Sequence, residues 1–200
     1  MQWYQKLHRY AQVWIERHDS FQKQTYRNRC VIATTHGTQA LTIPVVHDSG
    51  ATLTRDMRIS DHGNWRHLHW QAIRSAYGES PFFEFYADDI APFFEQRWTF
   101  LVDFNDAITE VMCRLLDIRP VIHSTDSYFR AGDGTILTEN DGTQQVDDYR
   151  DVIRPKHPQP DTSFHPQPYY QVFADKQGFL PNLSILDLLM NEGNESIFYL

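Results

Sequence analysis

Apolar residues recur along this chain with spacings that change from one segment to the next. Trp3, Tyr4, Leu7 and Tyr10 follow a three-to-four period, which predicts a short amphipathic helix at the start of the chain. The same spacing predicts a helix that carries Trp65, Leu68, His69, Ala72, Ile73 and Ala76, with Asn64 as its N-cap and Gly78 at the position after its last turn. It also predicts a longer helix from about Trp98 to Asp117. Between these two, residues 81–100 read as two helical turns interrupted near Pro92.

Other segments have the period of two that is typical of strands. Val13 and Ile15 lie on one face of a short predicted strand. Residues 30–34 and 40–45 flank the turn-forming pair His36-Gly37, which indicates a hairpin. Residues 57–60 are a further strand candidate. The pair Val121-Ile122 is another, and we expect this pair to be buried. Together these elements predict a single α/β or α+β domain, residues 1–200, with a mixed sheet of about five strands and flanking helices.

The amino-acid composition changes in the last third of the chain. Residues 131–168 contain three glycines, many acidic residues and five of the ten prolines, a composition that rarely packs a core. We expect a long loop or a lid there. Beyond it, Ser184 as N-cap with Asp187 three residues later reads as a capping box, and Gly193 can end the helix that follows.

Composition limits the classes of function. Eighteen basic and 26 acidic residues give a net charge of −8, which argues against a non-specific nucleic-acid binder. The chain has no apolar run of about 18 residues that would insert into a membrane, and its first residues do not resemble a secretory signal. We therefore expect a cytoplasmic protein, with Cys30 and Cys113 reduced and packed in the interior.

Standard catalytic motifs are missing from the sequence. It contains no CxxC or HExxH spacing for a metal, no GxSxG or SxxK nucleophile, and neither GxxxxGK[ST] nor GxGxxG for phosphates. His67 and His69 lie two residues apart, so on a helix they point in different directions and do not share a cation. The sequence thus predicts no metal site and leaves any cofactor unassigned.

The most suggestive local feature is basic. Residues 1–30 carry six basic and two acidic groups, and three of the cations fall in the segment from Lys23 to Arg29. One interpretation is a solvated loop. The other is an anion pocket in which Arg29 and Lys23 bind a carboxylate or phosphate while Asn28 and Tyr26 orient the ligand.

Two further features have alternative interpretations. His69 lies on the apolar face of its helix, either as a hydrogen-bonded core residue or as an acid/base group. Six aromatic residues follow it closely and either pack in the core or present a surface to a partner protein. They are Phe82, Phe83, Phe85, Tyr86, Phe93 and Phe94.

Several blocks of the sequence resemble those of a known protein family. QKQTYRNRCVIAT, LTIPV, WRHLHWQAIRSAYGESPFFEFY and YYQVF…GFLPNLSILDLLMNEG resemble the WbqC-like protein family, a bacterial family named after a product of O-antigen gene clusters. The resemblance covers most of residues 3–130 and 149–193. It implies a cytoplasmic protein tied to surface-polysaccharide building blocks, and it brings no settled reaction with it. Together with the basic loop and the inward-facing His69, this context favours a transferase-type enzyme of surface-polysaccharide precursor metabolism that binds an anionic small molecule, such as an activated sugar or acyl donor.

Carried over residue by residue, the resemblance marks positions in all four blocks. These are Tyr26, Asn28, Arg29, Trp65, His69, Tyr77, Gln171, Ser184, Asp187 and Asn191. From them, and from the basic loop that adds Lys23, we expect His69 and Tyr77 to be catalytic, and Lys23, Tyr26, Asn28, Arg29, Gln171 and Asp187 to bind the ligand.

The chain departs from the family pattern in two places. Relatives begin with an additional strand, and longer members have a Ser-Gly/Tyr-rich block where this chain has the acidic, proline-rich residues 131–168. These departures keep two alternatives open: a non-catalytic binding or scaffold protein, and a degenerate member without activity.

Overall fold

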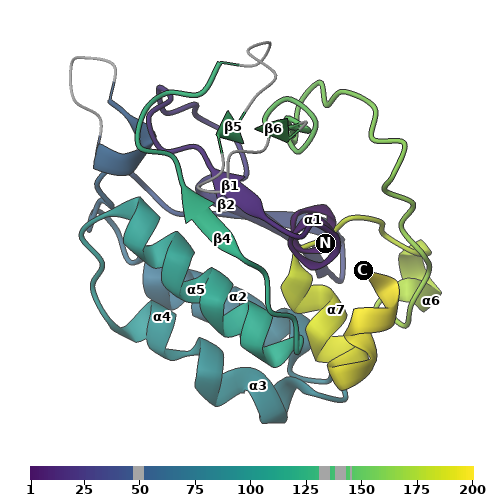
Figure 1. Ribbon diagram of the computed structural model, residues 1–200. Coiled ribbons are helices and arrows are strands. Elements are labelled where there is room, and N and C mark those ends of the chain that lie inside the picture. The colour runs from purple at the N-terminus through teal and green to yellow at the C-terminus, as the bar shows by residue number, and fades with distance from the viewer. Residues whose placement is uncertain (47–51, 131–135, 138–142, 145) are drawn as a thin grey trace.

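A computed structural model of the chain describes residues 1–46, 52–130, 136–137, 143–144 and 146–200 (Figure 1). Helices and strands are mixed along the described chain, as the sequence predicts. The helices are α1 (Gln2–Arg9), α2 (Trp65–Tyr77), α3 (Phe83–Ile90), α4 (Pro92–Glu95), α5 (Leu101–Leu115), α6 (Ala174–Gln177) and α7 (Ile185–Glu192). The strands are β1 (Val13–Ile15), β2 (Arg29–Thr34), β3 (Gly37–Thr42), β4 (Ile122–Ser124), β5 (Ile136–Leu137) and β6 (Thr143–Gln144), and short 3-10 helices span Thr54–Asp56 and Gly193–Tyr199.

The prediction of a mixed sheet of about five strands is wrong. The described strands form three separate pairs: β1 with β4 in parallel, and β2 with β3 and β5 with β6 antiparallel. The predicted strand at residues 57–60 makes only isolated bridges, Val45 with Ile59 and Arg58 with Phe100, so no ladder extends the hairpin. The pair Val121-Ile122 is also more exposed than expected, because β4 is covered on one side only.

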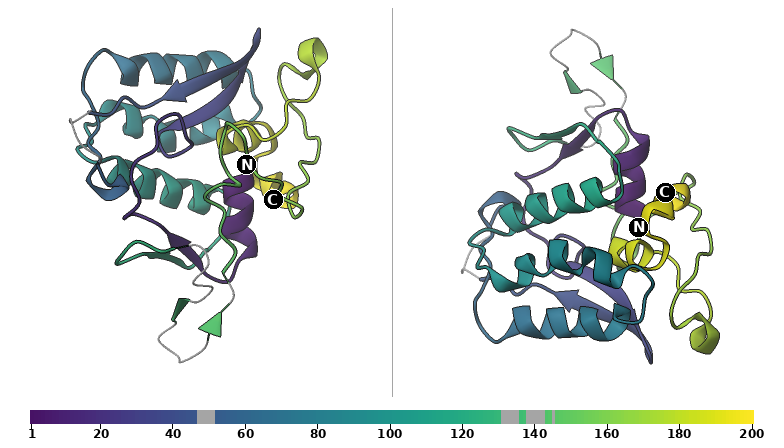
Figure 2. Two further views of the ribbon diagram at one scale, coloured as in Figure 1. Left: turned by 90° about the horizontal axis from the view of Figure 1, so that it is seen from above. Right: turned by 90° about the horizontal axis from the view of Figure 1, so that it is seen from below.

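Helices supply most of the core. Ile73 of α2, Ile90 of α3, and Leu188 and Leu189 of α7 are 0% exposed and belong to one cluster with residues from both ends of the chain. A second cluster joins Trp65 of α2 to α4 and α5. The two termini lie close together beside α1 and α7 (Figure 2). The amino group of Met1 donates to the carbonyl of Leu183 over 2.7 Å, which ties the start of α1 to the chain just before α7.

Helix ends show which local predictions hold. Ser184 caps α7, since its Oγ accepts from the backbone N–H of Leu186. Asn64 precedes α2 without a side-chain capping bond. Gly78 has a right-handed φ of −57° rather than the left-handed one expected after a helix. Glycine suits this position for another reason: a Cβ there would lie 2.7 Å from the carbonyl oxygen of Arg74.

Gly193 offers a matched test of backbone geometry. Its φ is +57°, and a Cβ would lie 2.6 Å from the Phe82 ring, whereas Gly63 has a φ of +71° with nothing within 4 Å. We expect Gly193→Ala to lower the free energy of unfolding by about 2 kcal/mol, and Gly63→Ala by about 1 kcal/mol, because only the first adds a clash to the strain. Urea unfolding of both variants measures the difference, and equal losses would contradict the role of Phe82.

Residues 146–168 contain no helix or strand, as expected for a loop. This loop still contacts the rest of the protein: it runs along α1, and Phe164 packs against the core. The rest of the predicted loop, residues 131–135, 138–142 and 145, lies outside the described residues.

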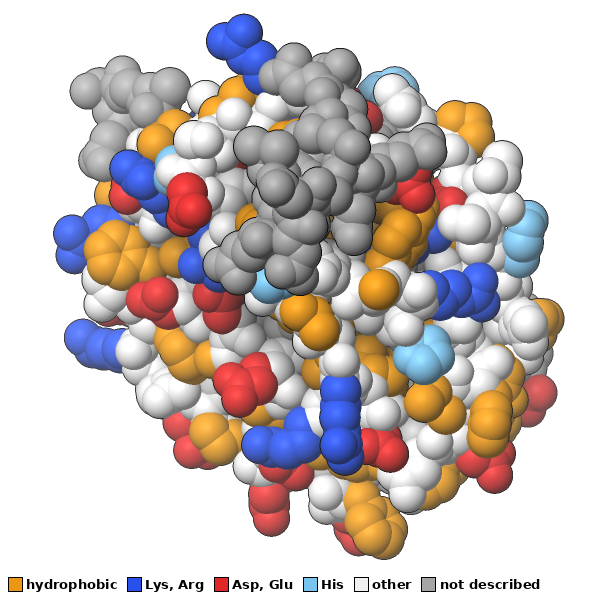
Figure 3. Space-filling model, viewed as in Figure 1, with side chains coloured by type: hydrophobic (Ala, Val, Ile, Leu, Met, Phe, Trp, Pro, Cys, Tyr) orange, Lys and Arg blue, Asp and Glu red, His pale blue; other side chains and the backbone are white. Residues whose placement is uncertain are grey.

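One face of the molecule (Figure 3) has no single electrostatic character. On the face seen in Figure 3, basic and acidic side chains are interspersed, with apolar ones between them. Among the described residues no helix has both the length and the hydropathy needed to cross a bilayer.

Candidate functional site

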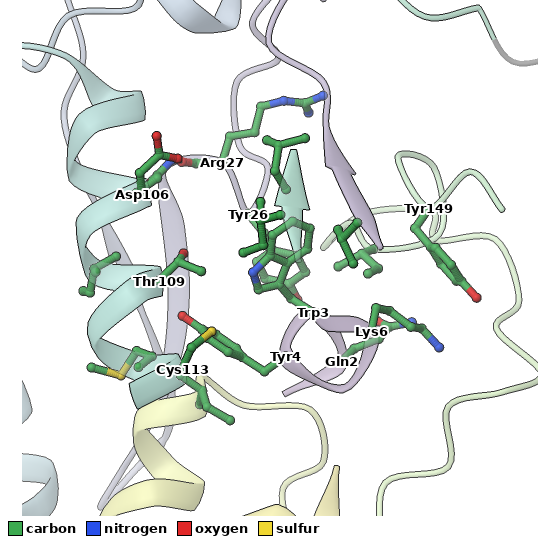
Figure 4. Close-up of a pocket in the computed structure, with 18 of the residues that line it drawn as sticks. Gln2, Trp3, Tyr4, Lys6, Tyr26, Arg27, Asp106, Thr109, Cys113 and Tyr149 are labelled. Atoms are coloured by element: carbon green, nitrogen blue, oxygen red, sulfur yellow. The ribbon is translucent and has the colours of Figure 1, made fainter. Parts of the chain in front are cut away.

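A large cavity lies between α1 and α5. Its volume is about 1230 Å³, somewhat above the roughly 300–1,000 Å³ of common small-molecule sites. Its walls come from α1, β1, the chain leading into β2, α5, the beginning of α7, and residues 146–154. Figure 4 shows side chains from several of these walls facing one another. The cavity thus brings together segments that are far apart in the sequence.

Three of the four residues predicted in the basic loop line this cavity. They are Tyr26, Asn28 and Arg29, whereas Lys23 is exposed and outside the cavity wall. Burial raises the pKa of the Tyr26 phenol, and the nearby positive charge of Arg29 opposes this rise. The structure therefore groups Tyr26 with Arg29 and leaves Lys23 apart.

Asn28 is held rigidly by Ile43. The backbone N–H of Ile43 donates to the Asn28 carbonyl over 2.8 Å, and Asn28 Nδ2 donates to the Ile43 carbonyl over 2.8 Å. The Ile43 carbonyl can only accept a hydrogen bond, so the atom of the Asn28 side-chain amide that faces it must be the nitrogen. Asn28 Oδ1 is buried and has no partner among the described residues. It is a fixed acceptor at the cavity wall, and the oxygen itself has almost no exposed surface.

Arg29 begins β2 opposite Thr42. Its Nε donates to Thr42 Oγ1 over 3.0 Å, which anchors the guanidinium from one side. Asn28 lies just before β2 and its amide is bonded to Ile43, whereas Arg29 is anchored to Thr42, so the two side chains are held by different residues. We infer that they contact different parts of a ligand.

The other cations on the cavity wall are already paired. Each lies within ion-pair distance of a carboxylate: Lys6 with Asp161, Arg17 with Asp106, Arg27 with Asp19, Arg114 with Asp89, Arg119 with Asp117, Arg150 with Asp148, and Arg154 with Asp151. Within the described part of the chain, Arg29 is the only lining cation for which no such carboxylate is found. Its charge is the one that a ligand anion would neutralise without displacing a protein group.

His69 also lines the cavity, from α2. Its ring lies edge-on to Trp65 and Phe94, with centroid distances of 5.2 and 6.3 Å. Burial lowers the pKa of His69 to about 4, because these apolar rings disfavour the charged imidazolium. The imidazole is therefore neutral near pH 7 and able to accept a proton from a reacting group.

Three predicted site residues lie elsewhere. Tyr77, Gln171 and Asp187 are buried outside the cavity wall. The Asp187 carboxylate accepts from Tyr169 Oη at 2.6 Å and from Gln171 Nε2 at 2.9 Å. The Tyr77 hydroxyl faces Asp187 without a hydrogen bond of normal geometry. These residues form a closed polar cluster that joins α2, α7 and the chain before α6, so they are not brought together with Arg29 and His69.

Of the predicted capping box, only the Ser184 half forms. Asp187 directs its carboxylate to Tyr169 and Gln171 instead of back to the start of α7. Gln171 is itself fixed at both ends of its amide: Oε1 accepts from Leu180 N and Nε2 donates to the Leu180 carbonyl. The cluster thus has its donors and acceptors largely satisfied inside the protein, which favours a structural role.

The sequence reasoning missed the contribution of α1. Trp3, Tyr4 and Lys6 line the cavity, and Tyr4 extends toward Thr109 and Cys113 of α5 (Figure 4). Burial raises the pKa of the Tyr4 phenol, so it stays protonated. The amphipathic pattern assigned these aromatic residues to the core. The signal that could have found them is the polar tip of Tyr4, which needs a partner when buried.

The two cysteines do not add a nucleophile. Both are free, and both line the cavity. Burial raises the pKa of each thiol to about 11, so both are protonated at neutral pH. This agrees with the expectation of reduced, packed thiols.

The six aromatic residues after α2 do not form an exposed surface. Tyr86 and Phe93 are buried, and Phe82, Phe83 and Phe94 are half-buried against the core. Phe85 is exposed at 78% and stands alone among the six. The interpretation as a partner surface made by all six rings is wrong, because most of them pack inside.

Comparisons with known proteins agree with the resemblance seen in the sequence. A family model described as the WbqC-like protein family matches residues 1–199. The chain is also similar to the "Uncharacterized protein Rv1507c" of Mycobacterium tuberculosis, with 29% identity over 193 residues that cover 90% of this chain and 83% of the relative. No solved structure matches the chain.

Proposed function

We propose that this chain, which belongs to the WbqC-like protein family, is a transferase-type enzyme that binds an anionic small molecule in the cavity beside α1. Its context is the metabolism of bacterial surface-polysaccharide precursors. The ligand is an activated donor, such as a nucleotide sugar or an acyl thioester. The observation that carries the proposal is Arg29, the cavity-lining cation for which the described residues offer no carboxylate partner of the kind found for the others.

Each cavity residue has a distinct task in this proposal. Arg29 binds the anionic group of the donor, and Tyr26 beside it contacts the same end of the ligand. Asn28 Oδ1 accepts a hydrogen bond from an N–H or O–H group elsewhere on the ligand. The size of the cavity suits a donor as large as a nucleotide sugar.

His69 moves the proton. The neutral imidazole takes it from the hydroxyl or amine of the acceptor as that group attacks the transferable carbon of the donor. The acceptor's oxygen or nitrogen forms the new bond to that carbon. The bond from the carbon to the phosphate or thiolate breaks, and the leaving group departs with the electron pair as an anion beside Arg29.

Ligand binding by the purified chain tests the role of Arg29. Thermal-shift titrations with UDP-N-acetylglucosamine, UDP-glucose and acetyl-CoA are compared for the native chain, Arg29→Ala and Arg74→Ala. We expect at least one probe to stabilise the native chain. Its affinity should fall roughly 10- to 100-fold in Arg29→Ala, because a charge-assisted hydrogen bond contributes about 1.5–3 kcal/mol.

Arg74→Ala is the matched control. It removes the same charge from an exposed position on α2 outside the cavity wall, so probe affinity should stay at the native level. A thermal shift that survives Arg29→Ala unchanged would contradict the anion site.

A further inference from the structure

Residues 146–163, which we call the strap, run along α1, and their first part forms one wall of the cavity. This first part includes Tyr149, Arg150 and Ile153. In Figure 4, Tyr149 lies beside α1 next to Lys6 and Gln2. Because the strap is part of the wall, its position decides whether this side of the cavity is covered.

The strap is fastened to α1 at Lys6. Lys6 Nζ lies 2.7 Å from Asp161 Oδ2, donates to Ser163 Oγ over 2.7 Å, and lies 4.8 Å from the centre of the Tyr149 ring. Gln2 Nε2 donates to the same Asp161 oxygen over 2.8 Å. The ion pair is buried, with side-chain exposures of 5% for Lys6 and 7% for Asp161. Burial opposes ionisation of Asp161, but the hydrogen bonds from Lys6, Gln2 and Ser163 outweigh it and hold the pKa of this carboxyl below its usual range.

Two weaker fastenings lie nearer the start of the strap. Tyr10 Oη lies 2.6 Å from Tyr149 Oη and donates to Asp147 Oδ2 over 2.6 Å. Arg150 Nη1 donates to the carbonyl of Phe129 over 2.9 Å. The Tyr10 contacts are exposed to solvent or half-buried, so each contributes less than the contact at Lys6.

The strap has little core to hold it. No residue of positions 146–163 is buried when its backbone and side chain are counted together. The side chain of Asp161, taken alone, is buried. Segments with few buried apolar contacts open at a lower free-energy cost than the core. Here polar contacts, rather than packed side chains, keep the strap closed.

We propose that the strap is a lid on the cavity, with the contact between Lys6 and Asp161 as its latch. Opening releases Asp161 and Ser163 from Lys6 and uncovers the flank of the cavity formed by α1. The lid rests on the proposed function, since the molecule it admits is the proposed ligand. Its opening, however, is measurable in the free protein.

Hydrogen exchange of the full-length chain without ligand tests the latch. The informative amides are those of Ile153 and Gln159, which donate to the carbonyls of Tyr149 and Asp151 within the strap. In Asp161→Asn we expect their exchange to be about tenfold faster or more, because the loss of one charge leaves Lys6 buried without its counter-ion. Tyr10→Phe, which removes the hydroxyl from the weaker fastening, should give a smaller increase in the same amides.

Asp151→Asn is the matched control. Asp151 pairs with Arg154 inside the strap over 2.8 Å, so this variant removes a strap carboxylate that does not hold α1. Its strap exchange should rise less than that of Asp161→Asn, because the Asp151–Arg154 pair lies inside the strap and is exposed, and exchange in α7 should be unchanged in all the variants. Equal strap exchange in Asp161→Asn and the native chain would overturn the latch, as would acceleration that extends equally to α7. Loss of probe binding in Arg29→Ala bears on the proposed function alone, so the two failures are distinguishable.

Discussion

Replacement of Asp187 by alanine is expected to lower the free energy of unfolding by about 3 kcal/mol. The side chain is 1% exposed, and its removal leaves Tyr169 Oη and Gln171 Nε2 buried without their shared acceptor. Each unsatisfied buried group costs about 1–3 kcal/mol. Urea unfolding followed by circular dichroism measures the loss, with the slope compared to confirm that the same surface unfolds.

Asp187→Asn is the control that separates charge from hydrogen bonding. It retains one carbonyl oxygen as an acceptor, so we expect a smaller loss, about 1 kcal/mol. Because Asp187 lies outside the cavity wall, the affinity for any probe that depends on Arg29 should be the same in the asparagine variant as in the native chain. A loss of probe affinity with unchanged stability would instead place Asp187 in the ligand site.

The same carboxyl predicts a dependence of stability on pH. Burial raises the pKa of Asp187 above its ordinary value of 3.8, against the hydrogen bonds from Tyr169 and Gln171 that lower it. Between 3.8 and this raised value the folded chain binds more protons at Asp187 than the unfolded chain. The contribution of this group to stability therefore falls as pH rises through that window. Asp187→Asn should remove this component of the pH dependence.

Replacement of His69 by glutamine is expected to slow transfer about 100-fold or more. A positioned acid/base group contributes about 10²–10⁴ in rate, and glutamine keeps a polar side chain of similar reach without a basic nitrogen. The measurement is release of UDP or CoA from whichever of UDP-N-acetylglucosamine, UDP-glucose and acetyl-CoA stabilises the native chain. With water as the acceptor, breakdown of the donor reports the same proton transfer.

His67→Gln provides the comparison on the same helix. His67 is exposed and does not line the cavity, so its replacement should leave the rate within about twofold of the native value, as for surface changes generally. The pH profile gives a second criterion. Since burial lowers the pKa of His69 to about 4, the component of the rate that depends on it should be flat from pH 5 to 8 and fall below that. A full rate in His69→Gln would exclude it as the base.

Elements predicted from local pattern correspond closely to the structure. The spacing of Trp65, Ile73 and Ala76 matches α2, and the apolar stripe in residues 98–117 matches α5. The predicted hairpin forms, but its two-residue turn is Thr35-His36, one position earlier than predicted, and β3 begins at Gly37, which has a φ of +116°, instead of at residue 40. These features depend on neighbours within a few residues, so the sequence pattern is sufficient to find them.

Strand pairing was predicted less well. Val13 to Ile15 forms a strand as expected, but its partner is Ile122 to Ser124, more than a hundred residues later. Nothing in the local alternation specifies that partner, nor that the pairing stops at two strands. The sheet of about five strands was wrong because periodicity identifies strands without identifying what lies beside them.

The candidate site also has a part that the sequence predicted and a part that only the structure revealed. The residue types of the basic loop indicate an anion site, and three of its residues do line the cavity. The assignment of Tyr77, Gln171 and Asp187 to that site remains a prediction from the resemblance, and their placement in a closed cluster favours a structural role. Sequence alone gave no sign that Lys6 would meet Asp161, because a helix and a loop separated by 155 positions share no local pattern.

By itself, the amino-acid sequence determined the longer helices, the hairpin and the family of this protein, because these follow from short-range spacing and from blocks of similar residues. Only the tertiary structure decided which polar groups meet. It placed Arg29 at a cavity with no carboxylate partner among the described residues, enclosed Asp187 with tyrosine and glutamine, and joined the strap to Lys6. The physical reason is that hydrogen bonds and ion pairs act over a few ångströms in space, and chain folding sets those distances.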